Sequence, residues 1–126
     1  MIEIKKVIDQ TLARNICKDA GIEFDEAYRI IATIEQGNVL NSAIFQYEDE
    51  EGQILHISGF EGDILLLDGL CRAILNIMDI QGVKVVYLTE KYEKLAKYIG
   101  FKQDEGRFKL YLEGFFQCEC CHKKGE

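Results

Sequence analysis

Apolar residues between positions 64 and 80 recur every three or four residues, which is the spacing of one face of an α-helix. Asp63 precedes this segment as the expected N-cap, and Gln81 and Gly82 end it. The β-branched and aromatic residues of segment 83–89 follow directly and predict a strand. The sequence therefore predicts a helix-to-strand unit whose buried helical face is formed by Leu66, Leu67, Leu70, Cys71, Ile74, Ile77 and Met78.

Alternation of apolar and polar residues predicts strands at 2–7, 28–35, 39–47 and 53–60. A tight turn at Gly37 and Asn38 and a polar turn at 48–52 join the last three into a meander. Further helices are expected at 9–20 and 91–99, and a final hairpin at 101–116 turns at 104–106. This order predicts an α+β fold, with a central mixed sheet, an antiparallel meander and helices on both faces.

The chain has 126 residues, of which 48% are hydrophobic and 29% charged, and no proline. This composition is typical of one globular domain, which we expect at 1–116, followed by a Cys-rich tail at 117–126. No apolar run of about 18 residues is present, so no membrane span is expected. The alternating N-terminus is unlike a signal peptide, and we expect a cytoplasmic protein.

The net charge of −7 argues against a nucleic-acid partner, because such partners are bound by clustered Lys and Arg. Five cysteines are an odd number, and in a reducing compartment they argue against a disulfide framework. Free thiols or a bound metal remain as interpretations.

The tail holds Cys118 and Cys121 in a C-x-x-C pair, followed by His122. Thiolates and imidazole are the ligands of tetrahedral zinc, so these three residues are candidate zinc ligands. A second half-site, from Cys17, His56 or another subunit, is needed to complete four ligands. The alternative is a flexible terminus with exposed thiols.

The order strand, helix, meander, helix, strand, helix, hairpin resembles that of the GNAT (Gcn5-related N-acetyltransferase) fold. Segment 69–75 is similar to the start of that family's pyrophosphate-binding helix, and segment 92–101 to its late helix, which ends in Gly100 and Phe101. The resemblance implies that acetyl-CoA lies between two splayed strands. It also implies that the pyrophosphate rests on backbone N–H groups at a helix start, where the helix dipole favours anions.

The family's pyrophosphate motif, Gln/Arg-x-x-Gly-x-Gly/Ala, falls on residues 66–71, where only Gly69 matches. Carboxylates at Glu61, Asp63 and Asp68 are expected to oppose phosphate binding. Residues 66–71 are also consistent with an ordinary core helix, because packing alone requires apolar residues at Leu66 and Leu70. The resemblance implies cofactor contacts from Leu66, Asp68, Gly69, Leu70 and Cys71.

The tyrosine that often serves this family as general acid falls on Ala96 here. Tyr92 and Tyr98 are the nearby tyrosines, and the resemblance implies that one of them takes this role. His56 is expected to face the substrate groove or solvent. The acidic run at 48–51 is either a solvated turn or the source of a base for a substrate amine.

The sequence thus predicts an acetyl-CoA-dependent N-acyltransferase that acts on a small amine. The alternative is a non-catalytic GNAT-like binding or assembly module whose tail carries metal. The two hypotheses differ in whether acetyl-CoA binds.

Overall fold

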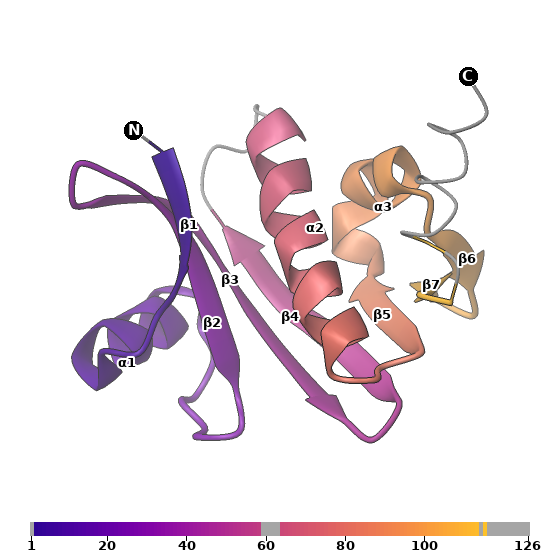
Figure 1. Cartoon of the computed structure of the whole chain (residues 1–126), viewed down its shortest axis with the longest axis horizontal. Helices are drawn as coiled ribbons and strands as arrows, with labels where there is room; N and C mark the ends of the chain where they lie inside the picture. Colours follow the sequence, from indigo (N-terminus) through magenta and orange to yellow (C-terminus); the bar gives the residue numbers. More distant parts are fainter. Residues whose placement is uncertain (1, 59–63, 114, 116–126) are drawn as a thin grey trace.

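The computed structural model describes residues 2–58, 64–113 and 115, and its elements follow the predicted order (Figure 1). They are β1 Ile2–Lys6, α1 Gln10–Asp19, β2 Arg29–Glu35, β3 Asn38–Glu48, β4 Glu51–Ser58, α2 Ile64–Ile80, β5 Val85–Thr89, the 3₁₀ turn η1 Glu90–Tyr92, α3 Glu93–Ile99, β6 Lys102–Asp104 and β7 Arg107–Tyr111.

The strands form a seven-stranded sheet in the order β1-β2-β3-β4-β5-β7-β6. The neighbouring strands β4 and β5 are parallel, and every other pair is antiparallel. A parallel pair needs a crossover connection, and α2 provides it. The prediction of a mixed sheet with an antiparallel meander is therefore confirmed.

Helices cover both faces of the sheet, as predicted. On one face α2 and α3 share a core with Ile31, Phe45 and Ile54 of the sheet. On the other face α1 packs against Ile30 and Ile44. Adjacent residues of a strand point to opposite faces, so Ile30 and Ile31 belong to different cores.

The helix ends follow the sequence signals. The Asp9 side chain accepts hydrogen bonds from the Thr11 and Leu12 N–H groups at 2.8 and 3.2 Å, which caps α1. Gly100 ends α3 in the left-handed conformation with φ of 119°. Helix α2 spans the predicted residues 64–80. No helix of the described residues is long and apolar enough to cross a membrane.

The first hairpin turn differs from the prediction by one residue. The left-handed residues are Gln36 (φ 51°) and Gly37 (φ 81°), whereas Asn38 pairs with Glu35 in the ladder. The prediction of a turn at Gly37 and Asn38 was wrong because two consecutive left-handed residues close this turn, and pairing of Glu35 with Asn38 leaves Gln36 and Gly37 between the strands. The polar turn at 48–52 is likewise shorter, because Glu48 already pairs with Glu51.

Candidate active site

A β-bulge in β4 shapes the candidate site. Ile44 of β3 pairs with His56, and the next residue, Phe45, pairs with Ile54, which leaves Leu55 as the extra residue. Leu55 consequently packs toward α1, whereas Ile57 packs into the core beneath α2. A bulge bends its strand and increases the local twist, so β4 changes direction at this point.

Strands β4 and β5 separate directly after the bulge. Their pairing runs from Glu51 and Val85 to Ile54 and Leu88, and in the described structure residues 55–58 of β4 have no partner on β5. We call this opening, between residues 55–58 of β4 and the end of β5 at Thr89, the splay. It presents an unpaired edge of backbone N–H and C=O groups that need other partners.

The Tyr92 side chain provides those partners at Ile57. Its hydroxyl accepts a hydrogen bond from the Ile57 N–H at 2.9 Å and donates one to the Ile57 C=O at 3.1 Å. Tyr92 ends η1, which continues directly from β5 and is capped by the Thr89 hydroxyl at 3.3 Å from the Lys91 N–H. The 3₁₀ turn that follows β5 thus places the Tyr92 side chain across the splay and against β4.

His56 lies beside this hydroxyl, with Nδ1 3.5 Å from the Tyr92 oxygen. Partial burial lowers the pKa of His56, and the nearby charge of Lys91 lowers this pKa further. The imidazole is therefore neutral at pH 7 and able to accept a proton. The sequence left His56 facing either the substrate groove or solvent, and did not pair it with Tyr92.

Helix α2 begins at the end of the sheet where β4 ends (Figure 1). The N–H groups that lack intrahelical partners belong to its first turn, from Ile64. Gly69, Leu70 and Cys71 lie farther along, where backbone N–H groups donate within the helix, and the last two side chains are fully buried. An anion bound at this helix would therefore contact the turn before Gly69.

The Asp68 carboxylate is neutralised within α2. The Arg72 Nε donates to both of its oxygens, at 2.9 and 3.1 Å. The expected repulsion of phosphate by Asp68 is thus balanced by the Arg72 charge. Burial first, and then the Asp68 charge, raises the pKa of Cys71 to about 12, so this thiol is not a nucleophile.

The other sequence candidates make no hydrogen bond at the splay among the described residues, or lie beyond those residues. Tyr98 of α3 is 52% exposed, and Ala96 is buried in the core. The three proposed zinc ligands, together with Glu61 and Asp63, fall outside the part of the chain that the structure describes. Within that part, no group of His, Cys, Asp and Glu side chains could hold a metal ion. The proposed zinc ligands are Cys118, Cys121 and His122.

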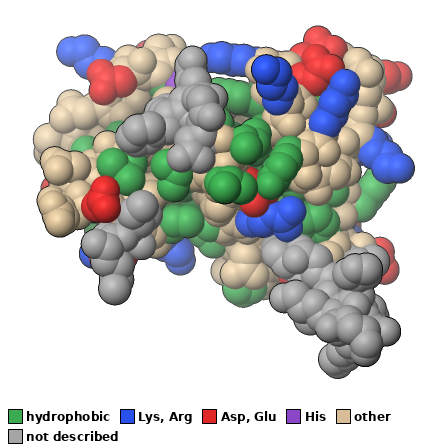
Figure 2. Space-filling view, turned by 90° about the horizontal axis from the view of Figure 1, so that it is seen from above, with side chains coloured by type: hydrophobic (Ala, Val, Ile, Leu, Met, Phe, Trp, Pro, Cys, Tyr) green, Lys and Arg blue, Asp and Glu red, His purple; other side chains and the backbone are tan. Residues whose placement is uncertain are grey.

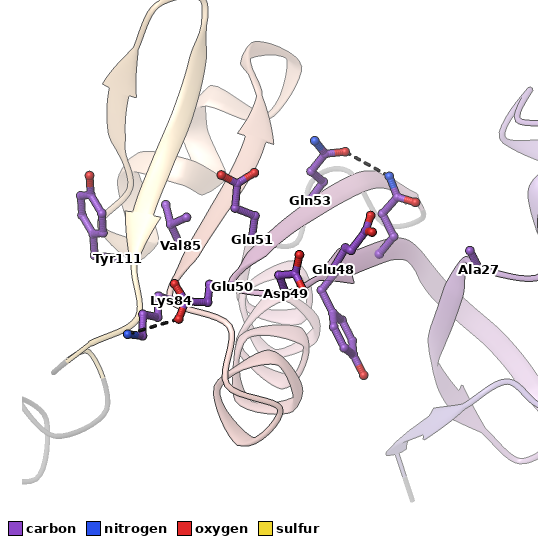
Figure 3. A pocket seen from close by; sticks show the side chains of 11 residues that line it. Ala27, Glu48, Asp49, Glu50, Glu51, Gln53, Lys84, Val85 and Tyr111 are labelled. Carbon is purple, nitrogen blue, oxygen red and sulfur yellow. Dashed lines mark hydrogen bonds and ion pairs between the residues drawn. The ribbon is translucent and has the colours of Figure 1, made fainter.

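The acidic run borders a separate hollow of about 1320 Å³ near the β3–β4 turn (Figure 3). Lys84 enters this hollow and pairs with Glu50 at 3.4 Å. Glu51 precedes Ile57 by six residues along β4, which is roughly 20 Å. These carboxylates therefore do not reach the splay. The lining residues are Ala27, Gln46, Tyr47, Glu48, Asp49, Glu50, Glu51, Gln53, Lys84, Val85 and Tyr111.

Figure 2 shows the molecule from above, onto the end where α2 begins. Hydrophobic side chains gather at the centre of this face, beside an acidic and a basic side chain, and both acidic and basic side chains lie toward its rim.

Solved structures show which proteins share this architecture. An acetyltransferase of the GNAT family from Staphylococcus aureus matches with a TM-score of 0.66 and 11% identity, over 89% of this chain and 99% of its own. The protein YhhK from E. coli, solved with coenzyme A bound, matches with a TM-score of 0.65 and 13% identity, over 88% and 98% of the two chains.

The spermidine/spermine N-acetyltransferase SpeG from Vibrio cholerae matches with a TM-score of 0.64 and 12% identity, over 93% of this chain and 98% of its own. No family model and no curated protein sequence matches this chain. At these low identities the comparisons establish the fold, which is the GNAT acyl-CoA N-acyltransferase fold expected from the order of elements.

Proposed function

We propose that this chain, which has the fold of the GNAT acetyltransferases, binds acetyl-CoA in the splay and transfers the acetyl group to a small amine. The observation that carries the proposal is the separation of β4 from β5 at the Leu55 bulge, which leaves Ile57 without a partner strand on that side. The Tyr92 hydroxyl and the neutral His56 imidazole lie at this opening.

The N-terminal part of α2 would hold the pyrophosphate. Its first turn supplies backbone N–H groups and the positive end of the helix dipole. A Cβ added at Gly69 would meet no described atom within 4 Å, so a ligand has room above this backbone. Leu66 and the paired Asp68 would flank it, while Leu70 and Cys71 support the helix from the core.

Acetyl-CoA supplies an acyl group activated as a thioester. The amine nitrogen attacks the carbonyl carbon, and the carbon–sulfur bond breaks. The Tyr92 hydroxyl gives its proton to the departing sulfur, and the neutral His56 imidazole takes the proton that the amine loses. Tyr98 is the second candidate for the proton donor, and a Tyr98→Phe variant separates the two.

A cationic amine is the favoured class of acceptor. The chain has a net charge of −7, which attracts cations at low ionic strength. SpeG, a protein of the same fold, acts on spermidine and spermine. The observations support the class of acceptor and leave the particular amine to a substrate screen.

Calorimetric titration with acetyl-CoA tests the proposal. We expect a dissociation constant in the micromolar range and a rise in the unfolding temperature, because ligands stabilise the state they bind. Absence of heat and of a thermal shift at millimolar acetyl-CoA would rule out the enzyme. A panel of amines, with release of free CoA thiol as the readout, then identifies the acceptor.

A second function is favoured by two observations. Only Gly69 matches the family motif, and Tyr92 closes the splay. A GNAT-fold module that binds a partner without catalysis is consistent with both. Acetyl-CoA binding without turnover on any amine would support this second function.

A further inference from the structure

The Tyr92 hydroxyl uses both hydrogen-bonding groups that Ile57 presents to the splay. One N–H and one C=O side by side on a strand edge are bound by groups from two successive amides of an extended arm, because the N–H and C=O of a single trans amide point in opposite directions. One amide of such an arm would accept from the Ile57 N–H, and the next would donate to the Ile57 C=O. Tyr92 and an amide-bearing ligand therefore compete for the same two atoms.

We infer that Tyr92 is a competitor of the ligand for Ile57, and that this competition selects for acyl carriers with two successive amides in their arm. The inference rests on the proposed function, because coenzyme A has two secondary amides in its pantetheine arm. Only a group that replaces both hydrogen bonds displaces the hydroxyl without leaving Ile57 unsatisfied. A ligand without this arm gains nothing at Ile57.

The backbone and the partial burial of Tyr92 allow its ring to rotate between a position that closes the splay and one that opens it. Tyr92 is at the junction of η1 and α3, and its backbone (φ −106°, ψ 39°) lies outside the helical region. Its ring is only partly buried at the edge of the main core, with the Lys91 ammonium 5.6 Å from the ring centre. A rotation of this ring opens the splay and leaves the fully buried residues in place.

The test compares two ligands on two variants by calorimetry. We expect Tyr92→Phe to bind CoA about five- to thirtyfold more tightly, the fold-change that corresponds to about one to two lost hydrogen bonds of the free protein. The affinity for 3′-phosphoadenosine 5′-phosphate, which lacks the pantetheine arm, should not change. Tyr111→Phe, at an exposed tyrosine of β7 beside the separate hollow, is the matched control, and should bind both ligands as the unmodified chain does.

Amide hydrogen exchange at Ile57 tests the contact without ligand. Tyr92→Phe should accelerate exchange at Ile57 about tenfold while exchange at Ile54, which pairs with β3 and β5, stays slow. Faster exchange at Ile57 in Tyr92→Phe, together with tighter CoA binding by this variant, supports the inference that Tyr92 competes with the ligand. Equal or weaker CoA binding by Tyr92→Phe overturns the inference and leaves the proposed function standing.

A third variant, Tyr92→Ala, separates failure of the inference from failure of the proposed function. Tighter binding of CoA by Tyr92→Ala than by the unmodified chain is further support, because removal of the ring then opens the splay to the ligand. Absence of CoA binding by the unmodified chain, Tyr92→Phe and Tyr92→Ala overturns the proposed function itself, and the competitor with it.

Discussion

Two buried hydroxyl side chains of the sheet differ in whether they have a partner. The Ser42 hydroxyl lies 3.1 Å from that of Ser58. Thr33 and Asn41 face each other across β2 and β3, are almost fully buried, and have side-chain polar atoms with no hydrogen-bond partner among the described residues. An unpartnered buried polar group costs about 1–3 kcal/mol, so these two residues lower the stability of the fold.

We predict that Thr33→Val raises the free energy of unfolding by about 1 kcal/mol, because it removes an unpartnered hydroxyl and keeps the shape. Ser42→Ala is the matched control, and should lower it by about 0.5–1.5 kcal/mol because Ser58 loses its partner. Urea unfolding measures both. A stability loss in Thr33→Val would mean that its hydroxyl is hydrogen-bonded in solution.

The stability at acid pH depends on His56. Burial lowers the pKa of this residue in the folded chain, whereas the unfolded chain has the ordinary value of about 6.5. The unfolded state binds more protons below pH 6.5, so stability falls as the pH falls from there through the folded pKa. We predict that His56→Gln loses less stability than the unmodified chain between pH 7.5 and 5.5.

Urea unfolding at the two pH values measures this difference. Carboxylates contribute equally to both proteins, so the comparison isolates His56. His122→Gln, at the remaining histidine of the sequence, is the control for the loss of an imidazole. A larger loss of stability in His56→Gln would contradict the lowered pKa.

At the scale of elements, α2 and β4 contain two glycines with opposite surroundings. A Cβ at Gly52 of β4 would lie 2.5 Å from the Met78 Sδ and 2.8 Å from its Cε, so this strand approaches α2 closely. Met78 is fully buried and has little room to move. At Gly69 of α2 the corresponding space is open. Packing thus explains Gly52, whereas no described atom lies within 4 Å of a Cβ at Gly69.

We predict that Gly69→Ala raises the free energy of unfolding by about 0.5–1 kcal/mol, because alanine is the better helix former. The same substitution at Gly52 should lower it by about 1–3 kcal/mol through overpacking against Met78. Chemical unfolding distinguishes the signs. If the pyrophosphate lies over Gly69, Gly69→Ala should also weaken acetyl-CoA binding, whereas unchanged affinity would move the anion away from this residue.

At the scale of the whole molecule, two cores share one sheet. The larger core joins α2 and α3 to the sheet and extends to Phe115, and the smaller core is beneath α1. Leu112 is buried, and its N–H donates to the Lys84 C=O at 2.8 Å, so the segment after β7 returns to the start of β5. The described core reaches Phe115, and we propose residue 116 as the end of the domain.

We predict that a chain ending after residue 116 keeps its unfolding midpoint within about 2 °C, which corresponds to about 0.5 kcal/mol in a domain of this size. A chain ending after residue 111 is the control. It loses Leu112 and Phe115 from the core and should be destabilised by at least about 2 kcal/mol. Thermal unfolding by circular dichroism measures both, and a large loss in the longer chain would place the tail within the domain.

Local sequence determined the elements of this protein. Apolar spacing predicted α2 over 64–80, Asp9 and Gly100 predicted helix ends, and the resulting order indicated the GNAT fold. These signals act within a few residues, so they are readable without a partner strand. Tyr92 was also a sequence candidate, as a proton donor.

Only the tertiary structure decided the geometry at the splay. The register of β3 against β4 creates the bulge at Leu55, and the contact between Tyr92 and Ile57 joins residues 35 positions apart. The pairing of Asp68 with Arg72 follows from helical spacing, but its burial depends on the surrounding elements. Strand register and side-chain reach are set by non-local packing, which no single segment of the sequence contains.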